Sequence, residues 1–424
     1  MWTLLVSAVI AGYVLVGGLP FVGTLLQTQA QQPINDAGAQ IRIFESVLQH
    51  IQSDYVDEPD LEKVRFGALR GLVAGLDPYS SYLTADQVRD YKMNGAAKRV
   101  GIGAEFSQLQ QYLYVISVVK GSNADKAGLK TGDVIEYIEN KATRDISLYD
   151  ARQMILGEAG SAVNLRVLRA GEKPQILKIV RGTYAVPVAE SRIEPGRIGV
   201  VKIFSLEKGE AEDIRKQVQS LKKQGVQKIV LDLRSVAAGE LEVAVETANL
   251  FIRTGELAKV LGRDGTVLRT FSADPAKAVF EGKMNVLIDY GTAGAAEVIA
   301  AAVLDHKRGE VVGERSFGAG IEQQLFTLRG GDGLLLTTAK WASPSGTPFL
   351  SDETATMGVK PSVEVKRPET PEPVEVEELI EQQQEDETDP TPEASPQPTP
   401  EAKKPAEPED VQLKKALELL RGNV

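Results

Sequence analysis

Residues 286–308 read VLIDYGTAGAAEVIAAAVLDHKR: an apolar run, a turn that contains glycine, and an alanine-rich segment of helical length. The apolar runs at 285–291 and 228–234 are short and rich in β-branched residues, which is typical of strands. Helical stretches at 241–251 and 295–307 alternate with these runs. The alternation predicts a core sheet built from βαβ units.

Two flanking regions extend this prediction. Residues 322–341 read as two strands joined by a hairpin that turns at 330–333, where three of four residues are glycine. Upstream, apolar residues recur at helical spacing from Arg42 to Leu76 and predict a small helical region. The sequence contains no evident internal repeat.

The turn inside 286–308 resembles the active-site turn of the C-terminal processing peptidases, which are tail-specific serine peptidases with a Ser-Lys dyad. Their pattern is Ser-Ala-Ser-Ala-Ser-Glu at the start of a helix, followed later by Thr-Phe-Gly-Lys-Gly-x-x-Gln. Residues 311–323 of this chain read VVGERSFGAGIEQ. The resemblance places the family nucleophile at Gly294 and the family base at Ala319. The glutamine that helps to hold the lysine is retained as Gln323.

The chemistry of these two positions predicts the loss of peptidase activity. A serine hydroxyl needs a neighbouring base to remove its proton, and a lysine base needs a lowered pKa to supply a neutral amine. Gly294 has no side chain and Ala319 has no group that titrates. Loss of one member of such a unit costs on the order of 10⁴ to 10⁶ in rate. We therefore expect no intact catalytic residue here and a pseudopeptidase rather than an enzyme.

An active peptidase with a relocated nucleophile is the alternative. The chain has no cysteine, which excludes a thiolate mechanism. Its two histidines, His50 and His306, fall in helical segments, and no Ser-His-Asp arrangement is evident. A shifted site would have to use hydroxyls and cations near the two vacated positions, namely Thr292, Ser316, Lys307 and Arg315.

A third departure concerns the turn that supplies backbone donors to the oxyanion. The family pattern is Asp-Leu-Arg-x-Asn-Pro-Gly-Gly, whereas residues 232–239 read DLRSVAAG. The asparagine, the proline and one glycine are replaced, which leaves Ala238 and Gly239 as the remnant. Oxyanion donors act only at defined positions, and a glycine there can adopt a positive φ. The alanine at 238 therefore puts the geometry of this turn in question.

A second domain is indicated by VGIGAEF at 100–106 and by the long run at 112–143, which look like a PDZ domain inserted in these peptidases. The resemblance assigns Gly101, Ile102, Gly103 and Ala104 to the loop whose N–H groups receive a peptide carboxylate. PDZ domains bind an extended peptide as an added strand, and that mode requires neither missing catalytic residue. A simple turn before a strand is the alternative interpretation of the two glycines. The motif LDPYSSYL at 76–83 also matches the family, with Tyr79 in place of histidine.

The N-terminal segment predicts membrane association. Residues 2–26 carry no charge and form a helix of about 37 Å if continuous, enough to cross a bilayer. No Lys or Arg precedes them, as a typical signal peptide would have, and 28–30 (TQA) is a weak cleavage site. We expect an uncleaved single-pass anchor, with a cleaved signal peptide or a buried helix as alternatives. The resemblance, rather than loop charge, implies a periplasmic or extracellular body.

The C-terminal region differs from the body in composition. Residues 367–410 carry 15 acidic and 3 basic residues and ten of the 21 prolines, so they account for the chain's net charge of −11. Such a segment cannot bury a core and is expected to be disordered. In 411–424, apolar side chains recur on one helical face, at Leu413, Ala416, Leu417 and Leu420. We expect this helix either to fray or to dock on the N-terminal helix, including that of another subunit.

These observations predict a multidomain α/β (α+β) protein with a core of the ClpP/crotonase-like peptidase type. The expected parts are 1–30 (anchor or signal), 38–95 (helical), 96–184 (PDZ), 185–366 (peptidase-like core), 367–410 (linker) and 411–424 (terminal helix). No metal-ligand or phosphate-loop spacing and no basic stripe is present, so we expect no cofactor, no metal and no nucleic acid. The expected function is to bind protein C-termini or unstructured segments as an adaptor or regulator. Partners would include an active relative, a cell-wall enzyme or a second copy, and a structural envelope scaffold is a further alternative.

Overall fold

The structure is a computed structural model that describes residues 36–93, 99–109, 111–351, 356–367 and 409–422. Its contacts divide the chain into two compact units, one up to Leu69 and one from Arg70 onward. The predicted anchor and nearly all of the acidic linker lie outside the described residues. Within the described ranges, no helix has the length and apolar character that a bilayer crossing requires.

The first unit is helical, as the sequence predicts. Helix α3 spans Ala37–Asp54, and its N-terminus is capped by the Asp36 side chain, which accepts a hydrogen bond from Gly38 N. Helix α4 spans Leu61–Ala74 and continues into the second unit. No residue of α3 is buried.

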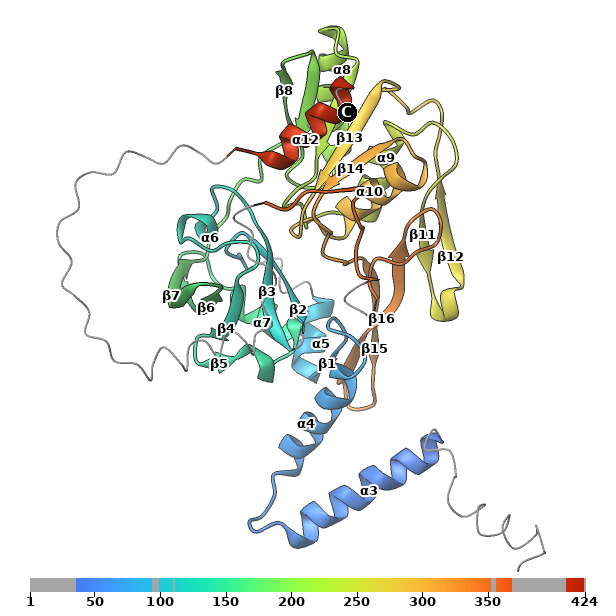
Figure 1. The fold of residues 1–424 in the computed structure, drawn as a ribbon. Helices are drawn as coiled ribbons and strands as arrows, with labels where there is room; N and C mark the ends of the chain where they lie inside the picture. The colour runs from blue at the N-terminus through green and yellow to red at the C-terminus, as the bar shows by residue number, and fades with distance from the viewer. Residues whose placement is uncertain (1–35, 94–98, 110, 352–355, 368–408, 423–424) are drawn as a thin grey trace, which may run out of the picture. The chain divides into compact units, whose positions relative to one another are not determined.

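The segment predicted to be a PDZ domain forms a curled sheet in the strand order β2-β3-β4-β6-β7, with β5 paired to β4 (Figure 1). Its strands are β2 (Ala104–Leu109), β3 (Tyr112–Val118), β4 (Val134–Ile138), β5 (Lys141–Ala142), β6 (Ala162–Arg169) and β7 (Glu172–Val180). Its helices are α6 (Asn123–Lys126), η2 (Thr143–Asp145) and α7 (Leu148–Ile155). Ile102, Leu113, Ile135 and Leu165 are fully buried in its core. Among the strands described, β2 has a neighbour on one side only.

The core contains a six-stranded sheet in the order β17-β14-β13-β10-β9-β8, parallel except for the antiparallel pair β8–β9. Its strands are β8 (Glu190–Glu194), β9 (Ile198–Lys202), β10 (Lys228–Asp232), β13 (Lys283–Ile288), β14 (Gly309–Gly313) and β17 (Val363–Glu364). The helices between them are α8 (Glu210–Lys223), α9 (Leu241–Asn249) and α10 (Ala295–Asp305). Their apolar side chains share one buried cluster with the sheet. The predicted βαβ core is confirmed.

A second sheet has the order β1-β16-β11-β12, with β15 also paired to β16. Its strands are β1 (Ser81–Leu83), β11 (Glu256–Leu261), β12 (Val267–Ser272), β15 (Ile321–Thr327) and β16 (Gly333–Ala342). The single turn η3 (Arg263–Gly265) joins β11 to β12, and α5 (Ala85–Lys92) follows β1. Strands β15 and β16 form the predicted hairpin, which turns between Leu328 and Asp332.

Helix α12 (Val411–Arg421) covers the other face of the six-stranded sheet. Ala416, Leu417 and Leu420 pack on residues of β9, β10, β13 and β14, and α12 lies beside β13 and β14 in Figure 1. The predicted amphipathic helix is therefore present. It is neither frayed nor dependent on the N-terminal helix for a partner, because the open sheet face offers an apolar surface within the same unit. Pairing of terminal helices between copies stays a prediction.

Candidate functional site

The turn between β13 and α10 contains Gly294, the position that the sequence motif assigns to the family nucleophile. Gly294 is the N-cap of α10, with φ 56° and ψ −111°. That conformation is sparsely populated by residues other than glycine. A Cβ built at Gly294 would meet nothing closer than Trp341 Cζ3 at 3.8 Å. The strand-turn-helix geometry therefore has room for a nucleophile that the sequence does not supply.

Glu297 joins this turn to the loop that contains the vacated base position. Its Oε2 accepts hydrogen bonds from the N–H groups of Gly294 (2.7 Å) and Ala319 (2.8 Å). Its Oε1 accepts from Gly318 N (2.8 Å) and from the Ser316 hydroxyl (2.5 Å). The side chain is fully buried, and this burial raises the pKa of Glu297 to about 7, although the four donors oppose the shift. One buried carboxyl group thus fixes the relative position of both vacated positions.

The side chain of Ala319 packs against apolar side chains, whereas its N–H group donates to Glu297. Ala319 packs against a cluster formed by Ile116 of β3, Ala293 and Phe317, and the rings of Phe317 and Tyr290 meet edge to face at 5.4 Å between centroids. A charged amine placed among these side chains would be poorly solvated, which lowers an amine pKa. The retained Gln323 does not reach this cluster with its amide: its Nε2 donates to the carbonyl oxygen of Tyr79 at 2.9 Å.

The remnant of the oxyanion turn lies against the start of α10. A Cβ at Gly239 would come within 2.6 Å of the Leu206 Cβ and 2.9 Å of the Ala295 Cβ, so this close approach requires glycine. Ala238 does not adopt a positive φ, so its alanine is compatible with the turn. Within the described part of the chain, the N–H groups of Gly239 and Ala295 have no hydrogen-bond partner. Two backbone donors, one in this turn and one at the start of α10, thus lack a partner among the described residues.

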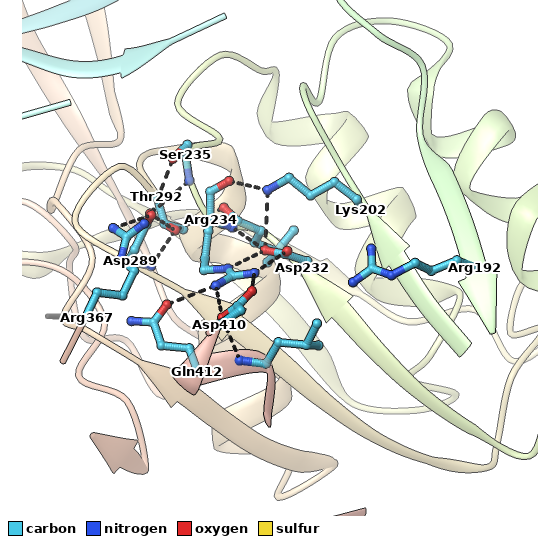
Figure 2. A network of polar contacts seen from close by, with 12 residues as sticks. Arg192, Lys202, Asp232, Arg234, Ser235, Asp289, Thr292, Arg367, Asp410 and Gln412 are labelled. Atoms are coloured by element: carbon cyan, nitrogen blue, oxygen red, sulfur yellow. Dashed lines mark hydrogen bonds and ion pairs between the residues drawn. The ribbon is translucent and has the colours of Figure 1, made fainter. Parts of the chain in front are cut away.

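A partly buried ionic network lies at the base of that turn (Figure 2). The Arg234 guanidinium forms a bidentate ion pair with the Asp232 carboxylate and another with the carboxylate of Asp410, which is the N-cap of α12. The shortest nitrogen–oxygen distance is 2.8 Å in each pair. Lys202 Nζ lies 3.3 Å from Asp232 Oδ1 and also donates to the Arg234 carbonyl oxygen. Burial opposes ionisation, but Lys202 and Arg234 lower the pKa of Asp232 to about 2. The N-cap of the C-terminal helix therefore contacts Arg234 directly, and Arg234 precedes the turn that contains Ala238 and Gly239.

A second set of contacts holds the turn at 289–294. Asp289 is fully buried and accepts from Ser235 N at 2.8 Å and from Arg367 Nη2 at 3.0 Å. The Thr292 hydroxyl donates to the Leu233 carbonyl oxygen at 3.0 Å and accepts from Asp289 N. The Asp289 and Thr292 side chains thus connect this turn to the backbone of the turn at 233–235 (Figure 2).

Asp410→Ala is expected to loosen α12, because the substitution removes both the helix cap and the ion pair with Arg234. We expect a loss of about 1–2 kcal/mol in the docking of α12, since a cap contributes about 1 kcal/mol and a partly exposed pair somewhat less. Hydrogen exchange of the amides of α12 measures this change. Lys414→Ala, which removes only the exposed contact with Glu409, is the matched control and should leave the exchange rates nearly unchanged. Equal protection in both variants would contradict the assigned role of Asp410.

The loop assigned to peptide carboxylate binding has its carbonyl groups engaged. Ile102 O accepts from Ala124 N, and Gly103 O accepts from Val119 N and from the Ser122 hydroxyl. Among the described residues, the N–H groups of Ile102 and Gly103 have no partner. Gly103 has φ 89°, and a Cβ there would lie 2.2 Å from the Ser122 Cβ. The pattern of fixed carbonyls and available N–H groups is suited to an anion such as a carboxylate.

Neither histidine has a hydroxyl group as its hydrogen-bond partner among the described residues. His50 Nδ1 lies 2.7 Å from Asp54 on exposed α3, and His306 Nε2 donates to the Glu256 carbonyl oxygen at 2.6 Å. Sequence reasoning did not single out Glu297 or the contact between Arg234 and Asp410. A glutamate three residues after the N-cap is a recognisable capping pattern in a sequence. The pairing of Arg234 with the distant Asp410 leaves no such pattern in the sequence around either residue.

Comparison with known proteins assigns the chain to a family. The Peptidase family S41 model matches residues 197–365, and a PDZ domain model matches residues 114–169. The carboxy-terminal-processing protease of Bartonella bacilliformis is 30% identical over 85% of this chain and 82% of its own length. The carboxy-terminal processing protease CtpA of Bacillus subtilis is 32% identical over 76% of this chain and 68% of its own length. This chain belongs to the S41 family of C-terminal processing proteases, as its sequence motifs indicate.

Further similarity supports the domain architecture. The probable CtpA-like serine protease of Staphylococcus aureus strain MSSA476 is 32% identical over 78% of this chain, but the match spans only 66% of its length. Among solved structures, the photosystem II D1 C-terminal processing protease superposes with a TM-score of 0.64 at 26% identity. That superposition covers 76% of this chain and 86% of the other. The multidomain α/β fold with a PDZ domain and an S41 core is confirmed.

Proposed function

We propose that this protein is a membrane-anchored, extracytoplasmic pseudopeptidase that binds protein C-termini or unstructured segments and acts as an adaptor or regulator. The observation that carries the proposal is the combination at one turn of a missing nucleophile and available backbone donors. Gly294 supplies no side chain although a Cβ would fit there, and the N–H groups of Gly239 and Ala295 have no partner among the described residues. Such a site can hold a peptide carbonyl without attacking it.

The candidates for a relocated nucleophile are held by hydrogen bonds. The Thr292 hydroxyl is fully buried and donates to the backbone at Leu233. The Ser316 hydroxyl is 2% exposed, contacts Glu297 at 2.5 Å and accepts from Val359 N. Arg315 donates to the Met357 carbonyl oxygen. Each hydroxyl has a carboxyl group within hydrogen-bond distance, Asp289 for Thr292 and Glu297 for Ser316, and a carboxylate can act as a base. Both hydroxyl residues are buried, however, and a nucleophile must reach its substrate, so this alternative is not favoured.

The second binding element of the proposal is the loop at 101–104. Its available N–H groups support recognition of a terminal carboxylate, and the adjacent edge of β2 supports strand addition. The location outside the cytoplasm, the anchor at 2–26 and a partner such as an active relative or a cell-wall enzyme are parts of the proposal that rest on the sequence. The relatives are named for carboxy-terminal processing, which fits a ligand that presents its C-terminus.

Purified full-length protein is expected to leave labelled casein intact, with the Bacillus subtilis relative as the positive control for the assay. Thr292→Ala and Ser316→Ala should likewise cleave nothing. Reproducible hydrolysis by the wild-type chain that disappears in either variant would establish a relocated nucleophile and refute the proposal.

Binding is tested separately on arrays of peptides that differ only in a free or amidated C-terminus. We expect the wild-type chain to retain the free carboxylate forms and to lose them on amidation. Gly103→Arg should abolish this difference, because no side chain fits beside Ser122. Equal binding of free and amidated peptides would instead favour a structural scaffold.

A further inference from the structure

Arg152 lies on the face of α7 that meets the edge strand β2. Its Nη2 donates to the Phe106 carbonyl oxygen at 3.0 Å, which connects the middle of β2 to the helix. The same side of α7 contains the buried residues Leu148 and Ile155, which lie four residues before and three residues after Arg152. Arg152 itself is exposed. A long cationic side chain thus spans the space between the helix and the strand edge.

The Phe106 carbonyl group is the kind of acceptor that an added strand would use. β2 ends the sheet order of its domain, so its outer edge can pair with an extended peptide. The available N–H groups of Ile102 and Gly103 lie at the start of the same strand. Phe106 is three residues beyond Gly103, about 10 Å along an extended chain. A peptide whose carboxylate is held by the loop would reach Arg152 two to four residues before its terminus.

The charge of Arg152 is not neutralised by a direct partner. Within the described residues, Arg152 forms no ion pair within 4 Å, and its hydrogen bond is to a neutral carbonyl group. The neighbouring carboxyl group of Glu105 influences Arg152 electrostatically, but burial raises the pKa of Glu105 and so disfavours its charged form. A ligand carboxylate could therefore form a charge-assisted bond that the protein alone does not provide.

We propose that Arg152 makes this strand edge selective for peptides that carry an acidic side chain two to four residues before a C-terminal apolar residue. The inference rests on the proposed function, in which the loop at 101–104 holds the carboxylate. A neutral peptide must compete with Arg152 for the Phe106 carbonyl oxygen or forgo that hydrogen bond. An acidic peptide draws the guanidinium onto its own carboxylate and frees the Phe106 carbonyl oxygen for the peptide N–H.

The test uses eight-residue fluorescein-labelled peptides that end in valine and differ only by Glu or Gln at two, three or four residues before that valine. Fluorescence anisotropy with the detergent-purified full chain gives the affinity of each. At the most favourable position, the peptide with Glu is expected to bind about 10-fold more tightly than the peptide with Gln, because a charge-assisted hydrogen bond replaces a neutral one. The advantage should shrink as salt is raised.

Three variants separate the charge of Arg152 from its packing. Arg152→Gln keeps a donor for the Phe106 carbonyl oxygen but loses the charge. The ratio of the affinities for the Glu and Gln peptides should therefore fall to about one, while the affinity for the Gln peptide stays unchanged. Arg152→Lys should retain part of the preference. Arg144→Gln removes an equal charge from the exposed η2 turn and should leave the ratio unchanged.

The possible outcomes distinguish failure of the role of Arg152 from failure of the proposed peptide-binding function. Carboxylate-dependent binding without a preference for Glu, or a preference that persists in Arg152→Gln, would overturn the role of Arg152 and leave the proposed function standing. If the folded chain binds none of the peptides, the proposed function fails, and the selectivity fails with it.

Discussion

Gly294→Ser combined with Ala319→Lys is expected to give the chain measurable peptidase activity, at least about 10²-fold above either single variant. A nucleophile and its base act as a unit, so neither substitution alone supplies a working pair. The turn before α10 already has the backbone conformation and the space for the new hydroxyl. The Gly239 and Ala295 N–H groups would be available to the developing oxyanion.

The environment of position 319 favours a neutral amine. Ile116, Ala293 and Phe317 surround it with apolar atoms, and poor solvation lowers the pKa of a lysine toward the range that a general base needs. The serine would pay about 1–3 kcal/mol of backbone strain at φ 56°. That cost is small beside the rate effect of a nucleophile.

Cleavage of labelled casein by the double variant, compared with both single variants, measures the effect. Gly294→Ser with Ala319→Met is the matched control, because methionine fills similar space without an amine. Circular dichroism verifies that each variant is folded. A folded double variant as inert as the methionine control would mean that these two side chains are not sufficient for catalysis, and that the turn at 235–239 is also incompatible with it.

The parts of the fold that follow local patterns could be predicted from the sequence. The alternation of apolar strands and helices around 228–307 predicts the βαβ core, and the glycines at 330–333 predict the hairpin of β15 and β16. The assignment of the family nucleophile position to Gly294 stays a prediction, which rests on the family motif in the turn and helix around it. In each case one short segment contains all the necessary information.

Features that depend on distant segments could not be predicted in this way. The amphipathic pattern of α12 gives its helical face, but its docking surface is assembled from four strands that are far apart in the chain. The contact between Arg234 and Asp410 joins residues 176 positions apart. Arg152 likewise reads as an ordinary surface residue until α7 packs beside β2 and brings it to Phe106.

Glu297→Leu is expected to destabilise the protein by about 4 kcal/mol or more. The substitution leaves the N–H groups of Gly294, Gly318 and Ala319 and the Ser316 hydroxyl buried without their acceptor. Each buried polar group that loses its partner costs about 1–3 kcal/mol. Urea unfolding followed by circular dichroism gives the free energy of unfolding. A loss below about 1 kcal/mol would show that these donors find other partners.

The same carboxyl group predicts an unusual dependence of stability on pH. Its folded pKa of about 7 lies above the unfolded value of 4.5, so the folded state binds the proton more tightly. The resulting stabilisation is fully present below pH 4.5 and is lost as pH rises through 7, a decrease of about 3 kcal/mol across the window. Asp232, with its lowered pKa of about 2, titrates at lower pH and does not interfere.

Glu297→Gln isolates this effect, because the amide does not titrate but keeps the size of the side chain. The difference in unfolding free energy between wild type and Glu297→Gln, measured by urea titration from pH 4.5 to 8, should fall as pH rises. Other titrating groups cancel in the difference. A difference that grows with pH would mean that the four donors outweigh burial and hold Glu297 ionised, in which case the carboxylate links the two vacated loops as a permanent charge.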